Sequence, residues 1–205
     1  MPKIRLGFLV SHRGSNMQAI IDACNDGRLD AVPAVVITNN PSCQALVRAQ
    51  QESIPNYIAN SEACGNNRQS SDEFIRRCLL EHRVDLVILA GYMKKVGSVI
   101  LDRFGGRMIN IHPSLLPKYG GKGMFGLHVH EAVLAAGERE TGATVHLVEE
   151  EYDKGPILAQ EKVSIEPGDD ATTLAARVLQ TEHRLLVDTL SKVIRGEINT
   201  QLAQR

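Results

Sequence analysis

The chain has 205 residues and a formal net charge of −1, with 43% hydrophobic and 23% charged residues. This length supports a packed core without covalent staples, and the near-neutral charge argues against nucleic acid or an anionic membrane as partner. The four cysteines include no C-x-x-C pair, so no structural zinc is expected. The apolar run at 4–10 is too short for a secretory leader or a membrane span, and we expect a cytoplasmic protein with reduced thiols.

Short apolar strands alternate with amphipathic helices over the first 112 residues. Strands are predicted at 4–10, 32–38, 84–90 and 108–111, with a weaker one at 54–58, and helices at 15–25, 42–52, 70–82 and 96–104. The strands are rich in Val, Ile and Leu without strict alternation, which is typical of a parallel sheet covered on both faces. The pattern predicts a Rossmann-like α/β fold, in which helices flank a mostly parallel sheet with right-handed crossovers.

The pattern changes after residue 113. We predict an irregular Gly- and Pro-rich loop at 113–127, a short helix at 128–136, strands at 143–149 and 157–163, and a long helix at 169–196 ending at Gly196. The two late strands form an antiparallel pair added to the sheet in this interpretation. Without internal repeats or linkers, the simplest organisation is one domain over 1–205, with a phosphate-binding half at 1–112 and a second half at 113–205.

The segment Ser11-His-Arg-Gly-Ser-Asn16 lies between the first strand and the first helix. Ligands of open α/β sheets bind at the carboxyl ends of strands, where a helix start points free N–H groups at an anion. Gly14 allows close approach to the backbone, and Ser15 or Asn16 can cap the helix or bond a phosphate. A plain capped turn is the alternative. A dinucleotide is disfavoured, because Gly14 is the only glycine between residues 8 and 26.

Two further segments carry polar residues of the kind that catalysis uses. Asn110 and His112 are two positions apart at the end of a strand, so their side chains project on the same side. An amide and an imidazole there can polarise a carbonyl and stabilise an oxyanion, although an isolated N-x-H more often satisfies loop backbone groups. Asp153 lies in a Gly- and Pro-containing turn and reads, by itself, as a turn former.

Five segments carry a combined signal. They are G-S-N at 14–16, L-A-G-Y-M at 89–93, N-I-H-P-S-L-L-P-K-Y at 110–119, D-K-G-P at 153–156 and E-H at 182–183. With these segments, the chain resembles the phosphoribosylglycinamide formyltransferases, a folate-dependent family. The segments occur in the family's order and span nearly the whole chain. The resemblance implies transfer of a formyl group from 10-formyltetrahydrofolate to the amine of 5-phosphoribosylglycinamide, in de novo purine biosynthesis and without a metal.

The resemblance also implies roles for individual residues. Asn110, His112 and Asp153 would form the catalytic triad, with a protonated His112 stabilising the oxyanion. The ribonucleotide would be bound by Gly14, Ser15 and Asn16 at its phosphate and by Glu182 at its ribose or amine. The folate would be bound by Arg68, Met93, Lys94, Lys95, Val96, Asn110, Glu149, Glu150, Glu151, Tyr152 and Asp153. The expected partners are these two small molecules rather than nucleic acid or membrane, and the expected assembly is a monomer or a homodimer.

The chain departs from the family pattern in a few places. His12 stands where many members have Gly, Lys94 replaces a common Arg, and Leu179 replaces a Gln found in some. The loop at 120–126 is longer than in some members. These departures bear on substrate contacts rather than on the chemistry.

The other histidines receive plainer interpretations. His128 and His130 form an H-x-H pair, but positions i and i+2 do not share a helix face, so a metal pair is disfavoured. His146 is interpreted as a satisfied structural residue within a strand, and His82 as a solvated residue at a helix end.

Three alternative functions remain open at this stage. Formyltetrahydrofolate deformylase shares the Asn, His and Asp residues, but it resembles this chain plus an N-terminal regulatory domain, for which a first strand at residue 4 leaves no room. Methionyl-tRNA formyltransferase would need a further C-terminal domain and a basic surface. A non-catalytic module that binds a nucleotide or folate is disfavoured by the complete Asn-His-Asp set.

Overall fold

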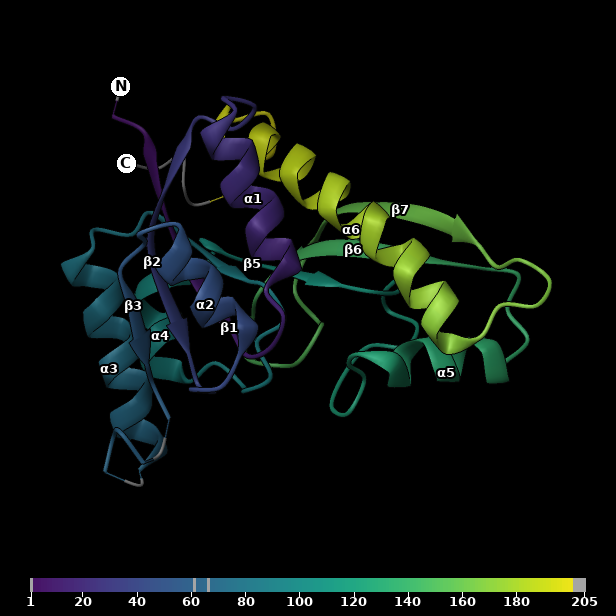
Figure 1. Ribbon diagram of the computed structural model, residues 1–205, viewed down its shortest axis with the longest axis horizontal. Helices are drawn as coiled ribbons and strands as arrows, with labels where there is room; N and C mark the ends of the chain where they lie inside the picture. Colours follow the sequence, from purple (N-terminus) through teal and green to yellow (C-terminus); the bar gives the residue numbers. More distant parts are fainter. Residues whose placement is uncertain (1, 61, 66, 201–205) are drawn as a thin grey trace.

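The computed structural model describes residues 2–60, 62–65 and 67–200 (Figure 1). The strands in this part are β1 (Ile4–Val10), β2 (Ala31–Thr38), β3 (Asn56–Ile58), β4 (Leu86–Leu89), β5 (Met108–His112), β6 (Glu140–Leu147) and β7 (Ile157–Ser164). The helices are α1 (Ser15–Asn25), α2 (Gln44–Gln51), α3 (Arg68–Glu81), α4 (Ser98–Phe104), α5 (Leu127–Ala135) and α6 (Ala171–Ile194).

These strands form one sheet in the order β3-β2-β1-β4-β5-β6-β7. The pairs from β3 to β5 are parallel, and β6 and β7 are antiparallel to their neighbours. This confirms the predicted fold class, including the late antiparallel pair. Because β1 pairs with β2 on one side and β4 on the other, the strand order reverses there. Such a switch point opens a crevice at the carboxyl ends of the two strands, where ligands of α/β proteins bind.

Two apolar cores pack on opposite faces of the sheet, and successive residues of the central strands alternate between them. In β1, Leu6 and Phe8 belong to the core shared with α1 and α6, whereas Leu9 belongs to the core under α3 and α4. Ile88 and Val87 of β4 divide in the same way. Both faces are therefore buried, which explains why these strands read as continuous apolar runs.

The weak strand predicted at 54–58 is shorter in the structure, where β3 begins at Asn56. The N–H of Ile54 still donates to the carbonyl of Ala49 in α2 (2.8 Å), so this residue belongs to the turn that closes the end of the helix. Pro55 has no N–H to add to a ladder, although its carbonyl accepts from Val36 in β2 (2.9 Å). The strand can therefore start only after the proline.

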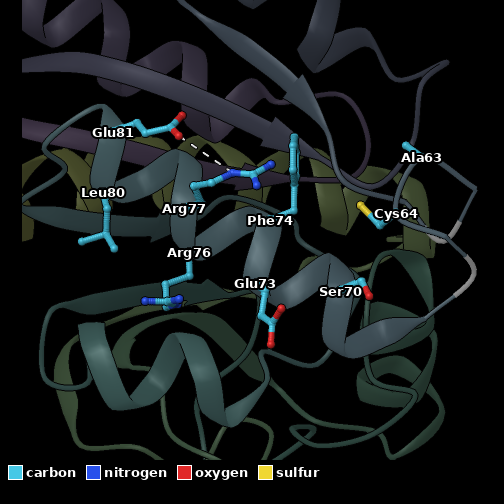
Figure 2. Close-up of a pocket in the computed structure, with 9 residues that line it drawn as sticks. All are labelled: Ala63, Cys64, Ser70, Glu73, Phe74, Arg76, Arg77, Leu80 and Glu81. Carbon is cyan, nitrogen blue, oxygen red and sulfur yellow. Dashed lines mark ion pairs between the residues drawn. The ribbon is translucent and has the colours of Figure 1, made fainter.

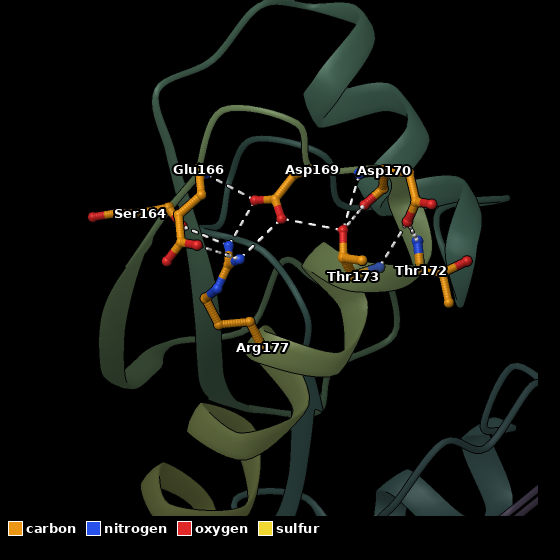
Figure 3. A network of polar contacts seen from close by, with 7 residues as sticks. All are labelled: Ser164, Glu166, Asp169, Asp170, Thr172, Thr173 and Arg177. Carbon is orange, nitrogen blue, oxygen red and sulfur yellow. Dashed lines mark hydrogen bonds and ion pairs between the residues drawn. The ribbon is translucent and has the colours of Figure 1, made fainter.

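Helix α6 crosses the sheet beside α1 (Figure 1) and brings Glu182 into the interior. It begins with a capping box, in which the Asp170 carboxylate accepts from the N–H of Thr173 (2.8 Å) and the Thr173 hydroxyl accepts from the N–H of Asp170 (2.9 Å). Two guanidinium nitrogens of Arg177 donate to the carboxylate of Asp169, at 2.6 and 2.9 Å (Figure 3). The helix ends before Gly196, as predicted. No helix among the described residues is both long and apolar enough to cross a membrane.

Candidate active site

A cleft of about 950 Å³ opens at the carboxyl ends of β1, β4 and β5. Its walls are residues 12–16, 89–96, 110–113, 121–127 and 148–153, together with His130, His146 and one face of α6. This volume lies at the upper end of the range for small-molecule sites. The cleft contains every predicted site residue except Arg68, which begins α3 and whose side chain lies outside the described part of the structure.

The three predicted catalytic residues meet in this cleft. Asn110 and His112 are two positions apart in β5 and both line the cleft, which confirms that they project on the same side. Asp153 comes from the loop after β6, where its backbone adopts a left-handed conformation (φ 56°) that is uncommon for a residue other than glycine. Its Oδ2 lies 3.6 Å from His112 Nδ1, beyond hydrogen-bonding distance. Residues 41 positions apart in the sequence are therefore neighbours, as the resemblance implied.

His112 is almost fully buried and oriented by the backbone. Its side chain is 5% exposed, and Nε2–H donates to the carbonyl of Tyr119 at 2.7 Å. Burial lowers the pKa of His112 below its ordinary value, and this effect outweighs Asp153 and the Tyr119 carbonyl, which both raise it. The lowered pKa favours the neutral imidazole before reaction, and the bond to the Tyr119 carbonyl places a proton on Nε2. The protonated His112 that the resemblance implied at the oxyanion belongs to the reacting state and stays a prediction.

Asp153 is held as a carboxylate. Its Oδ2 accepts the N–H of Gly121 at 2.8 Å, and its Oδ1 lies 3.5 Å from Nε2 of His146. Burial alone would raise the pKa of Asp153, but His146, His112 and the Gly121 N–H together hold it below the ordinary value. These contacts favour the ionised form of the Asp153 carboxyl.

His146 is a site residue that sequence reasoning missed. Its Nε2 lies 3.0 Å from Nδ2 of Asn110, and its Nδ1–H donates to the carbonyl of Leu147 at 2.8 Å. With its proton on Nδ1, the ring accepts one N–H of the Asn110 amide at Nε2, which leaves the second N–H for a ligand. The antiparallel register pairs Asn110 with His146 directly, and no pattern in the sequence reveals that register.

The amino terminus of α1 also lines the cleft. The helix is capped by Gly14 in a left-handed conformation (φ 67°), without a side-chain cap, so the suggestion that Ser15 or Asn16 caps it is wrong. Glycine is required there because a Cβ would lie 2.6 Å from Cβ of Ala45 in α2. The first N–H groups of α1 therefore have no side-chain cap, which is the arrangement that binds anions.

Asn16 and Glu182 meet beside this helix start, although 166 positions separate them. The Asn16 Nδ2 donates to Glu182 Oε2 at 2.7 Å, and both residues are buried. Burial raises the pKa of Glu182, and the Asn16 hydrogen bond offsets part of that rise. The buried Oδ1 of Asn16 has no hydrogen-bond partner within the described residues.

The predicted folate-binding residues line the cleft from two loops. Residues 93–96 follow β4, and this loop is joined to the end of β1 because the N–H of Met93 donates to Oγ of Ser11 at 2.8 Å. Residues 149–152 follow β6 and are exposed at the rim. The two loops and Asn110 form one continuous lining next to His112 and Asp153.

A second hollow of about 510 Å³ lies on the outer side of α3 (Figure 2). Figure 2 shows Arg77 turned toward Glu81, at an N–O distance of 3.8 Å, with its guanidinium near the Phe74 ring. Among the described residues that line this hollow, none is a site residue that the sequence predicts. Over residues 2–60, 62–65 and 67–200, no three or more His, Cys, Asp or Glu side chains are grouped so that they could hold a metal ion.

Comparisons with known proteins show the family to which the chain belongs. A model of the formyl transferase family matches residues 4–190. A phosphoribosylglycinamide formyltransferase of Haemophilus influenzae is 41% identical over 88% of this chain and 82% of that protein. The chloroplastic enzyme of Arabidopsis thaliana is 37% identical over 95% of this chain, which spans 66% of the plant protein. The crystal structure of glycinamide ribonucleotide transformylase 1 from Symbiobacterium toebii matches with a TM-score of 0.88 and 36% identity, over 95% of this chain and 89% of that one. The chain therefore belongs to the formyl transferase family and, within it, to the phosphoribosylglycinamide formyltransferases.

Proposed function

We propose that the protein transfers the formyl group of 10-formyltetrahydrofolate to the amine of 5-phosphoribosylglycinamide. The observation that carries the proposal is the meeting of Asn110, His112 and Asp153 in a cleft that is also lined by the amino terminus of α1, a helix start without a side-chain cap. The cleft is large enough to bind two small molecules end to end, so both reactants can lie in contact before the reaction.

The ribonucleotide binds at the α1 end. The N–H groups after Gly14 bind its phosphate, and the helix dipole favours the negative charge there. The free Oδ1 of Asn16 accepts a hydrogen bond from a ribose hydroxyl, and Glu182 keeps the Asn16 amide in that orientation. The glycyl amine then extends toward His112 and Asp153.

The formyl donor binds along residues 93–96 and 149–153, with its formyl group beside Asn110. Lys94 and Lys95 of the first loop also line the cleft and supply positive charge for an anionic donor. Glu149, Glu150 and Glu151 border the other loop and supply hydrogen-bond acceptors for a pteridine.

The first chemical step forms the new carbon–nitrogen bond. When the amine attacks the formyl carbon, the formyl oxygen gains negative charge and the attacking nitrogen becomes positive. Nδ1 of the neutral His112 takes a proton from that nitrogen, and Asp153 stabilises the resulting imidazolium. The imidazolium and the free N–H of the Asn110 amide then face the oxyanion.

The second step breaks the bond between the formyl carbon and the folate nitrogen. The carbonyl re-forms, and His112 Nδ1 donates the same proton to the departing nitrogen. One proton has then moved from the ribonucleotide amine to the folate, with no net change at the enzyme. No covalent bond to the protein is required, which agrees with a cleft whose reacting centre presents an amide, an imidazole and a carboxylate.

The test is to measure tetrahydrofolate release from 10-formyltetrahydrofolate with and without 5-phosphoribosylglycinamide. We expect release only when the ribonucleotide is present. Equal release in its absence would instead indicate a deformylase that uses water, and no release under either condition would indicate a binding module.

A further inference from the structure

Two backbone groups of one turn hold the predicted catalytic pair. The carbonyl of Tyr119 accepts from Nε2 of His112 at 2.7 Å, and the N–H of Gly121 donates to Oδ2 of Asp153 at 2.8 Å. These two groups are two residues apart. The path of the backbone over 119–121 therefore sets the position of both side chains at once.

This turn is under backbone strain. Tyr119 has φ 56°, a left-handed conformation that a bulky residue adopts only where its surroundings impose it. The turn also packs tightly, because a Cβ on Gly120 would lie 2.5 Å from Leu116 Cδ2 and 3.2 Å from Cβ of Asp153. A strained, close-packed turn needs contacts from outside itself to keep its shape.

Glu138 supplies such contacts from the other side of the loop. Its Oε1 accepts from the hydroxyl of Tyr119 at 3.0 Å and from Nζ of Lys118 at 2.8 Å. The carboxylate is mostly covered, with a side-chain exposure of 25%, and these two donors lower its pKa below the ordinary value. An ionised acceptor shared by adjacent residues fixes both of them relative to α5.

The fold places Glu138 there through the end of α5. Gly137 is left-handed (φ 65°), and its N–H donates to Leu134 at 3.0 Å, while the N–H of Glu138 donates to Val133 at 3.4 Å. This Schellman arrangement reverses the chain directly after the helix. Glu138 is consequently anchored to a helix that packs on the core through Val133, rather than to the loop it contacts.

The earlier part of the loop has separate supports. The hydroxyl of Ser114 donates to the carbonyl of Lys118 at 2.7 Å, and the hydroxyl of Thr144 donates to the carbonyl of Ser114 at 2.6 Å. These bonds connect residues 114–118 to β6. Removing Glu138 therefore leaves that part attached and releases the side chains that fix the turn beyond it.

We propose that Glu138 is a positioning residue, which acts through Tyr119 and Lys118 to hold His112 and Asp153 in their reacting geometry. The expected effect of Glu138 on turnover rests on the proposed function. Its expected effect on the position and pKa of His112 does not. It assigns a role in catalysis to a residue that does not line the cleft.

The protonation of His112 gives a direct readout. Asp153, His146 and His130 are the titratable groups that face it, and the Tyr119 carbonyl is the acceptor for its Nε2–H. Loss of that acceptor disfavours the imidazolium, so the pKa of His112 should fall when the turn loosens. A loss of folded protein alone would leave this pKa unchanged.

The experiment compares Glu138→Ala, Glu138→Gln and Tyr119→Phe with wild type. Glutamine keeps an acceptor oxygen and should restore most of the function, whereas Tyr119→Phe removes one donor and keeps the ring. We expect kcat to fall about tenfold in Glu138→Ala with both KM values within about twofold, since a displaced group affects the transition state most. The His112 ring resonances, titrated by NMR, should report a lower pKa in the same variant.

Glu140→Ala is the matched control, because Glu140 also accepts from a lysine, Lys162, but lies on β6, and within the described residues it has no hydrogen bond to Tyr119 or Lys118. It should behave as wild type. Near-normal kcat and an unmoved His112 pKa in Glu138→Ala would overturn the proposal, as would lost activity with an unmoved pKa. If Glu138→Ala does not fold, Tyr119→Phe decides by the same two readouts. Absence of formyl transfer in wild type, with the His112 pKa still lowered in the variants, would refute the proposed function alone.

Discussion

At the scale of single residues, the burial of His112 determines how the reaction begins. An exposed imidazole beside a carboxylate would be protonated at rest and would offer no lone pair to the attacking amine. Burial removes that proton, and the Tyr119 carbonyl fixes the remaining one on Nε2. In the proposed mechanism, Nδ1 is then a base at the start of the reaction and an acid at its end, which suits a group that must pass one proton between two nitrogens.

Replacing Asp153 by Asn tests this role. The variant keeps the size of the side chain and removes the charge that stabilises the His112 imidazolium. We expect kcat to fall by at least about a hundredfold, with smaller changes in KM, because the lost interaction acts in the transition state. Asp153 raises the pKa of His112, so its loss should move the limb of the pH–rate profile that reports His112 to lower pH. Near-normal kcat with an unmoved profile would leave Asp153 as a turn residue only.

The residues show which parts of the site a sequence can predict. The spacing of Asn110 and His112 at a strand end is local, so their common direction follows from strand geometry. The site roles of Asp153 and Glu182 were predicted only from the family resemblance, because local sequence patterns do not show which residues meet across the fold. His146 was missed for the same reason, since its contact with Asn110 depends on the register of β5 and β6. The lowering of the His112 pKa by burial could not be predicted, because burial cannot be read from its neighbours in sequence.

At the scale of elements, the start of α1 should control binding of the ribonucleotide. Ser15→Ala removes a hydroxyl from the first turn, beside the N–H groups that bind the phosphate in our proposal. We expect the KM for the ribonucleotide to rise about tenfold, while the KM for the folate stays within about twofold. Steady-state kinetics with each substrate varied in turn measures both.

A matched control for this prediction is Ser98→Ala. Ser98 is also the first residue of a helix that follows a glycine, but it lies outside the cleft. It should leave both KM values unchanged. Equal rises in the two KM values of Ser15→Ala would contradict the assignment of the phosphate to the α1 terminus. Gly14→Val is a less selective probe, because its side chain would collide with Ala45 and strain a left-handed backbone.

The elements themselves were largely predictable. The strand at 4–10 and the helix at 15–25 have the predicted bounds, and the other helices agree within about two residues at each end. The difference at β3 arises from Pro55. Strand β6 was predicted at 143–149 and lies at Glu140–Leu147, because the chain leaves the sheet earlier to form the loop that bears Asp153. Neither strand partners nor loop paths are encoded by local periodicity.

At the scale of the whole molecule, protein side chains provide all the stabilisation of the oxyanion in the proposed mechanism. Asn110 and the transient His112 imidazolium face the oxyanion, and no Lewis acid is needed for that role. We therefore predict full activity after exhaustive treatment with a chelator, measured as tetrahydrofolate release under saturating substrates. Activity that is lost on chelation and restored by zinc or magnesium would contradict this mechanism.

The central claim is that the formyl carbon moves from one small molecule to the other inside this cleft. The most direct measurement supplies 10-formyltetrahydrofolate labelled with ¹³C in its formyl group and follows the label by NMR, with wild type and with His112→Ala. The account predicts that the label appears on the glycyl nitrogen of the ribonucleotide, in equal amount with tetrahydrofolate, and at a rate lowered by at least about a hundredfold in His112→Ala. Label released as free formate, or transfer that is undiminished in the variant, would contradict it.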